Sequence, residues 1–158
     1  MKYKDLFAKW GLTSIKLNLS FAEIEFGKND SDKVAAWEMY VELITRITTQ
    51  KLCDDTGDEI TALESVYRIF AITRDILKIH GRECKGFTKI AVIVLNQIIR
   101  PFTAKWHKSS IDGTLDTTEG KNRFRQELNC LQIELRKYSG LLAEIAEVED
   151  LTTIETGD

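Results

Sequence analysis

Residues 124–145 read FRQELNCLQIELRKYSGLLAEI and carry the clearest helical pattern in the chain. Apolar side chains recur there at alternating steps of four and three residues, which is typical of a helix that packs along one narrow seam. The seam consists of Phe124, Leu128, Leu131, Leu135, Tyr138, Leu142 and Ile145. We predict a helix over about 118–148, and this period favours a neighbouring helix that crosses it at about 20°.

Three further segments also carry helical patterns. We predict a helix from Ser31 or Asp32 to about 52, a second over 58–80 that ends at Gly81, and a third over 83–99. The apolar face of the first is Val34, Trp37, Val41, Ile44 and Ile47, joined by Tyr40. The second has an extra apolar face made of Ile69, Ile72, Ile76 and Ile79. Helical spacing continues past Pro101, so we expect the third helix to kink there and run on to about 108.

The first 30 residues differ from the rest of the chain. Apolar and polar residues alternate between Ile15 and Phe21, which is a strand signal. A lone strand leaves its edges unpaired, so we expect this extended segment to lie on the helices or to pair with another chain.

These patterns together predict a mainly α protein. We expect a four-helix up-and-down bundle over 31–150 with a kinked third helix, an extended N-terminal segment over 1–30 packed on it, and a flexible acidic tail over 151–158. A chain of 158 residues is long enough to bury a core without disulfides or metals.

Composition and charge limit the partners and the cellular compartment that we expect. The formal net charge is −3, so we do not expect the whole molecule to attract nucleic acid or an anionic membrane. The longest apolar run, over 90–95, is too short for a bilayer that needs about 20 residues. The three cysteines are Cys53, Cys84 and Cys130, and their odd number and spacing favour a reducing compartment. We therefore expect a cytoplasmic protein without a membrane partner.

A basic-aromatic cluster surrounds Pro101. Between Arg82 and Lys108 there are six Lys and Arg residues and one Glu. One interpretation is a site for a small anion or nucleotide, another is a nucleic-acid accessory surface, and a third is an ordinary solvated face. The residues of the anion hypothesis are Arg100, Lys105, Trp106, His107, Arg123 and Arg125.

The seam of the 118–148 helix also has two interpretations. It closes the chain's own bundle, or it is shared with a second chain, in which case the contact residues are Leu128, Leu131, Leu135, Tyr138 and Leu142.

Patterns that carry catalysis or bind metals are missing from the sequence. His107 has no nucleophile or carboxylate at a diagnostic spacing, and Gly81 interrupts the His80–Cys84 pair that would form half a metal site. We therefore predict no cofactor, no metal and no enzymatic activity.

Three stretches resemble one group of proteins. They are AAWEMYVELITR at 35–46, LNQIIRPFTAKWH at 95–107 and VEDLT at 148–152. With them the chain resembles a group of small uncharacterised bacterial helical proteins that carry an R-P-F-x-x-K-W-H segment. The resemblance implies a bacterial, cytoplasmic origin and a place in a multi-gene system, with defence systems as one setting, and it carries no catalytic residue.

We therefore expect a non-enzymatic helical interaction module. Its partner would be another protein chain or a second copy, which makes it an accessory subunit or a homo-oligomer. The alternatives are the anion or nucleotide sensor and the nucleic-acid accessory protein described above.

Overall fold

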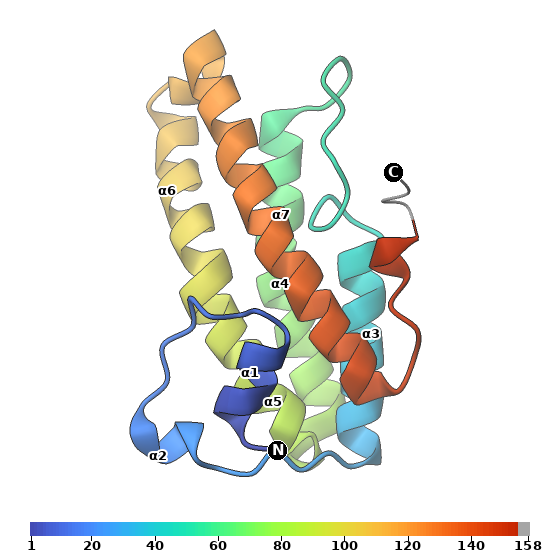
Figure 1. The fold of residues 1–158 in the computed structure, drawn as a ribbon. Coiled ribbons are helices and arrows are strands. Elements are labelled where there is room, and N and C mark those ends of the chain that lie inside the picture. Colours follow the sequence, from blue (N-terminus) through green and yellow to red (C-terminus); the bar gives the residue numbers. More distant parts are fainter. Residues whose placement is uncertain (155–158) are drawn as a thin grey trace.

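The computed structural model describes residues 1–154 and is mainly helical, as the sequence predicts (Figure 1). The α-helices are α1 (Tyr3–Lys9), α2 (Leu19–Ala22), α3 (Asp30–Ile44), α4 (Glu59–His80), α5 (Lys85–Val94), α6 (Arg100–Ile111) and α7 (Thr118–Ala146). The π-helical segment η2 (Leu95–Ile99) and the 3-10 turns η1 (Gly81–Glu83), η3 (Thr114–Asp116) and η4 (Leu151–Thr153) complete the list.

The long helices pack around α7. It passes in front of α4, from α6 at one end of the molecule to α3 at the other, and its most extensive contact is with α3 (Figure 1). Helix α4 lies between α3 and α6 and contacts both. The whole predicted seam of α7 is buried, with no member more than 6% exposed.

One buried carboxylate joins the starts of two helices. Asp32 is 1% exposed and forms a capping box with Asn29, which fixes the start of α3. Its Oδ1 also accepts a hydrogen bond of 2.8 Å from the backbone N–H of Phe87, in the first turn of α5. Gly86 lets the two helices approach this closely, because a Cβ at that position would lie 3.0 Å from Asp32 Oδ2.

Helix α3 ends earlier than the sequence pattern predicts, at Ile44 rather than near Leu52. A run of hydroxyl side chains follows it. Thr48 and Thr49 both donate side-chain hydrogen bonds to the Leu43 carbonyl, at 2.6 and 2.9 Å. Such bonds satisfy the free carbonyl groups at a helix end and allow the chain to leave the helix.

The chain remains helical through Pro101. Proline cannot donate a backbone hydrogen bond and crowds the carbonyl one turn before it, but it fits the first turn of a helix. Pro101 lies in the first turn of α6, directly after the wider turn of η2, where the Arg100 N–H reaches back to the Leu95 carbonyl. The helical stretch therefore continues to Ile111, beyond the predicted end at 108.

The predicted strand in the N-terminal segment is wrong. Residues 1–154 contain no strand, only an isolated antiparallel bridge between Lys2 and Glu25. The segment instead forms α1 and α2, and Asn18 caps α2 with its side chain. Residues 15–18 of the alternating stretch are irregular, and residues 19–21 belong to α2. The backbone of Lys16 exchanges two hydrogen bonds with the side chain of Gln97.

The chain turns back after α7 and runs along α3 (Figure 1). Glu147 adopts the left-handed conformation, with φ 60°, and the Val148 N–H donates to the Ala143 carbonyl at 3.0 Å. This is a Schellman-type helix ending, which usually places glycine where Glu147 stands. The Leu151 N–H then donates to the hydroxyl of Tyr40 on α3. The start of the predicted flexible tail is therefore ordered, and 155–158 lie outside the described residues.

Replacing Asp32 with alanine should destabilise the fold by about 3 kcal/mol, because it removes one helix cap and leaves the buried Phe87 N–H without an acceptor. The matched control is Asp30→Ala, since the Asp30 side chain is fully exposed and makes one ion pair, at 3.8 Å from Lys33. That control should cost less than about 1 kcal/mol. Urea unfolding of both variants checks this, and an equal loss would contradict the role given to Asp32.

Candidate functional site

A groove of about 380 Å³ lies between α3 and α4. Each helix supplies four lining residues, and those of α4 come from its C-terminal part. The groove is lined by Trp37, Glu38, Val41, Glu42, Ile72, Asp75, Ile76 and Ile79.

Large apolar side chains remain exposed at this groove. Trp37 is 45% exposed and Ile79 is 72% exposed, and Val34 on the neighbouring turn of α3 is 46% exposed. Trp37 is nevertheless held in place, because its ring lies 5.9 Å from that of Tyr40, which is fully buried. The exposed side chains of Trp37 and Ile79 therefore belong to one groove rather than to separate places on the surface.

This surface corrects the apolar face predicted for the first helix. The prediction placed Val34, Trp37 and Tyr40 in the core, but Val34 and Trp37 are 46% and 45% exposed and only Tyr40 is fully buried. The buried stripe is Ala35, Ala36, Met39, Tyr40 and Leu43. The two small alanines are therefore fully buried, while the larger Val34 and Trp37 remain about half exposed.

Carboxylates line the groove beside the apolar side chains. Glu38 lies 3.0 Å from Nε2 of His80, and Glu42 accepts a hydrogen bond of 2.8 Å from Nε of Arg46. Asp75 forms no ion pair with any residue in 1–154. No lysine or arginine is among the described residues that line the groove. The arrangement suits an apolar anchor flanked by positive charge.

The residues of the anion hypothesis do not meet at one place. Arg100 lies over the Phe70 ring, 4.8 Å from its centre, and His107 packs edge-on against Tyr67, so both turn towards α4. Arg123 faces Glu119 on its own helix at 3.5 Å.

The remaining residues of that hypothesis turn towards other partners. Lys105 and the indole Nε1 of Trp106 both donate to Glu127 on α7. Arg125 donates to Glu59 at 2.7 Å and to the carbonyls of Cys53 and Gly57 at 2.9 Å each. Lys105, Trp106 and Arg125 thus connect helices or a loop, and Arg123 pairs within its own helix, so the six residues turn to several different partners.

The seam residues proposed for a second chain are also satisfied within the molecule. Leu128, Leu135 and Leu142 are fully buried, and Leu131 and Tyr138 are at most 6% exposed. This burial favours the alternative in which the seam closes the chain's own bundle.

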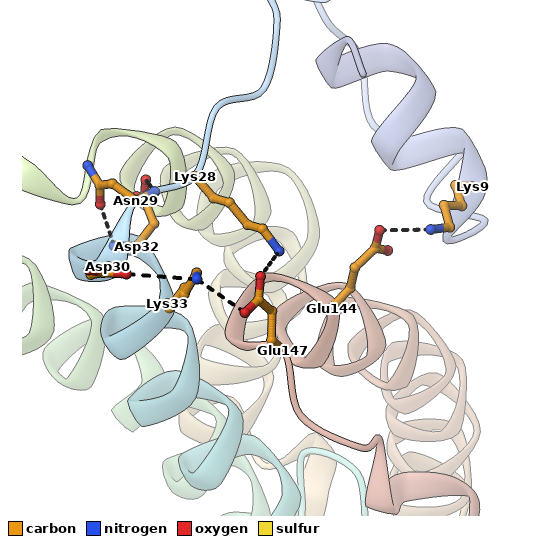
Figure 2. Close-up of polar contacts among 8 residues, drawn as sticks. All are labelled: Lys9, Lys28, Asn29, Asp30, Asp32, Lys33, Glu144 and Glu147. Atoms are coloured by element: carbon orange, nitrogen blue, oxygen red, sulfur yellow. Dashed lines mark hydrogen bonds and ion pairs between the residues drawn. The ribbon is translucent and has the colours of Figure 1, made fainter.

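Two carboxylates near the end of α7 hold the N-terminal segment (Figure 2). Glu147 lies between Lys28 and Lys33, at 2.7 and 3.1 Å, and Glu144 accepts a hydrogen bond of 2.7 Å from Lys9. Because the side chains point at one another, this clasp of Lys9, Lys28, Lys33, Glu144 and Glu147 joins three parts of the chain. It is a structural cluster, since each carboxylate already has a cationic partner.

The clasp changes the titration of its acids. Hydrogen bonds from Lys28 and Lys33 lower the pKa of Glu147 below its usual value of 4.5. Partial burial raises the pKa of Glu144, but the hydrogen bonds from Lys9 and Trp10 outweigh this and leave its pKa below the usual value.

The cysteines differ in their environments. Cys84 is buried and lies 3.3 Å from the Gly81 carbonyl, whereas Cys53 and Cys130 are exposed. Hydrogen bonds from the side chain and backbone of Thr56 and the backbone of Asp55 lower the pKa of Cys53 to about 7. In the described part of the chain, no group of three or more His, Cys, Asp or Glu side chains is placed to hold a metal ion.

Sequence reasoning missed the groove, although one signal pointed to it. The extra apolar face of the 58–80 helix is wider than a single neighbouring helix can cover. Ile72 and Ile79 belong to that face, and both line the groove.

Searches of protein-family models, curated proteins and solved structures found no match to this chain. Within residues 1–154, none of the helices is both long and apolar enough to pass through a bilayer.

Acid should open the N-terminal segment before the rest of the fold. The pKa values of Glu144 and Glu147 are lower in the folded chain, so their stabilisation is present at neutral pH and is lost as the pH falls through the folded pKa. Hydrogen exchange should show the Leu12 amide losing more protection than α7 amides between about pH 6 and about pH 3.

Two variants test the origin of this pH response. Glu147→Gln should weaken Leu12 protection at neutral pH and reduce its dependence on pH. Glu149→Gln should behave as the parent chain does, because that exposed residue lies outside the clasp. An unchanged pH response in Glu147→Gln would contradict the clasp.

Cys53 should react first with iodoacetamide at about pH 7, because much of it is thiolate there. Thr56→Val should slow its alkylation several-fold by removing the hydroxyl that stabilises the thiolate. Mass spectrometry of timed samples gives both rates. Alkylation of Cys130 at the same rate as Cys53 would contradict this expectation.

Proposed function

We propose that this protein is a non-enzymatic interaction module. Its scaffold is a four-helix up-and-down bundle, kinked where η2 meets α6, and its docking surface is the α3–α4 groove. From the resemblance of the R-P-F-x-x-K-W-H segment, we further propose that the protein acts in the bacterial cytoplasm as part of a multi-gene system.

The observation that carries the proposal is the exposure of Trp37 beside Ile79. Burying a large apolar side chain contributes about 1.5–3 kcal/mol, and tryptophan is enriched among residues that dominate binding energy. In the fold, Trp37 remains 45% exposed and Ile79 remains 72% exposed. A partner that covers the groove would bury both side chains and gain this free energy.

The geometry of the site supports binding. The groove combines large apolar side chains with carboxylates, which is the composition of a surface that binds an apolar anchor beside positive charge. The dispersal of Arg100, Lys105 and Arg125 to separate partners makes the anion sensor the weaker alternative.

Trp37→Ser should abolish assembly with the partner, which we expect among the products of adjacent genes. Ile133→Ser is the matched control, because Ile133 is 52% exposed on α7 and lies outside the groove. Size-exclusion chromatography with light scattering measures both variants, alone and mixed with each neighbouring product. A parent chain that stays monomeric in every mixture would count against the proposal.

A further inference from the structure

We infer that the partner seated in the α3–α4 groove is a cationic amphipathic helix of a different protein, not a second copy of this chain. The inference rests on the proposed function and identifies the chemistry of its partner. Two observations carry it: the charge of the groove and the shape of its walls.

The charge of the groove is one-sided. Its lining holds three carboxylates, and the described lining residues include no lysine or arginine. The recorded contacts of Glu38 and Glu42 each use one carboxylate oxygen, Oε1 and Oε2 respectively, and Asp75 has no ion pair with a described residue. Each carboxylate therefore keeps accepting capacity for a partner's lysine or arginine.

This charge argues against a second copy. In a two-fold symmetric dimer, a patch meets the same patch on the partner. Two copies of the groove would place six carboxylates in one contact, counting three from each lining. Like charges brought together at an interface cost several kcal/mol, and water cannot screen them there. A partner with cations beside its apolar anchors would gain energy from the same residues.

The walls of the groove favour a helical partner. They are two regular helices that lie side by side, and the lining spans Trp37–Glu42 on α3 and Ile72–Ile79 on α4. The α4 wall is about two turns long, or roughly 10 Å at 1.5 Å per residue. An amphipathic helix laid in such a groove contacts it with residues i, i+3 or i+4, and i+7, and these would meet Trp37 and Ile79.

The test uses two synthetic helical peptides with the same leucines at i, i+3, i+4 and i+7. One carries lysine at the flanking positions and the other carries glutamate. Fluorescence anisotropy with the full chain should show that the lysine peptide binds at least about tenfold more tightly at low salt, and that this preference shrinks at high salt.

Three variants separate the apolar and charged contributions. Trp37→Ser should weaken binding of the lysine peptide at least about tenfold, because it removes the apolar anchor point. The triple variant Glu38→Gln, Glu42→Gln, Asp75→Asn should abolish the preference for lysine but retain binding. Ile133→Ser should bind as the parent chain does. Circular dichroism confirms that each variant is folded.

The outcomes distinguish the two proposals. Equal binding of both peptides, or a dimer of this chain that Trp37→Ser disrupts, would overturn the cationic-helix inference and leave the interaction module standing. Unchanged binding of the lysine peptide to Trp37→Ser would show general charge attraction and overturn the inference. A chain that binds neither peptide and stays monomeric with every neighbouring product would overturn both.

Discussion

The carboxylate of Asp32 holds together parts of the fold that are distant in sequence. Buried charge is tolerated in a protein when hydrogen bonds replace the lost water, and here backbone N–H groups of Asn29 and Phe87 do so. The N-termini of two helices also carry partial positive charge, which favours an anion between them. The position of α5 against α3 therefore depends on a contact that links residues 55 positions apart.

The charge of Asp32 also affects Tyr3 in the N-terminal segment. Burial raises the pKa of Tyr3 to about 12, and the charge of Asp32 adds to the effect. Tyr3 is 2% exposed, and its ring packs against Phe21 and Phe26. The N-terminal segment is thus attached to the bundle by an apolar layer near Asp32 and by the clasp at the end of α7.

The helices that sequence predicted best are those with local signals at both ends or along their length. Asp58 caps α4 and Gly81 ends it, and the repeating seam defines α7. Helix α1 was missed because its buried residues pack against side chains far along the chain, as Tyr3 does against Phe21 and Phe26. The buried face of α3 was mispredicted because hydrophobicity ranks Val34 and Trp37 above Ala35 and Ala36, whereas close helix packing selects small residues. The α3 wall of the groove was missed for that reason, whereas the extra apolar face of α4 did indicate the opposite wall.

Within the predicted basic-aromatic cluster, sequence identified the residues but not their partners. Lys105 and Trp106 lie 22 and 21 positions before Glu127, and no spacing rule connects residues across the turn between α6 and α7. Their pairing depends on how α6 is rotated, and that rotation is set by η2. A π turn contains about one residue more than an α turn, so it acts as an insertion within an otherwise regular helix. A homologue shortened by one residue there would turn everything beyond it by about 100°. Trp106 would then leave the core, so the burial of this side chain depends on the length of the π-helical stretch.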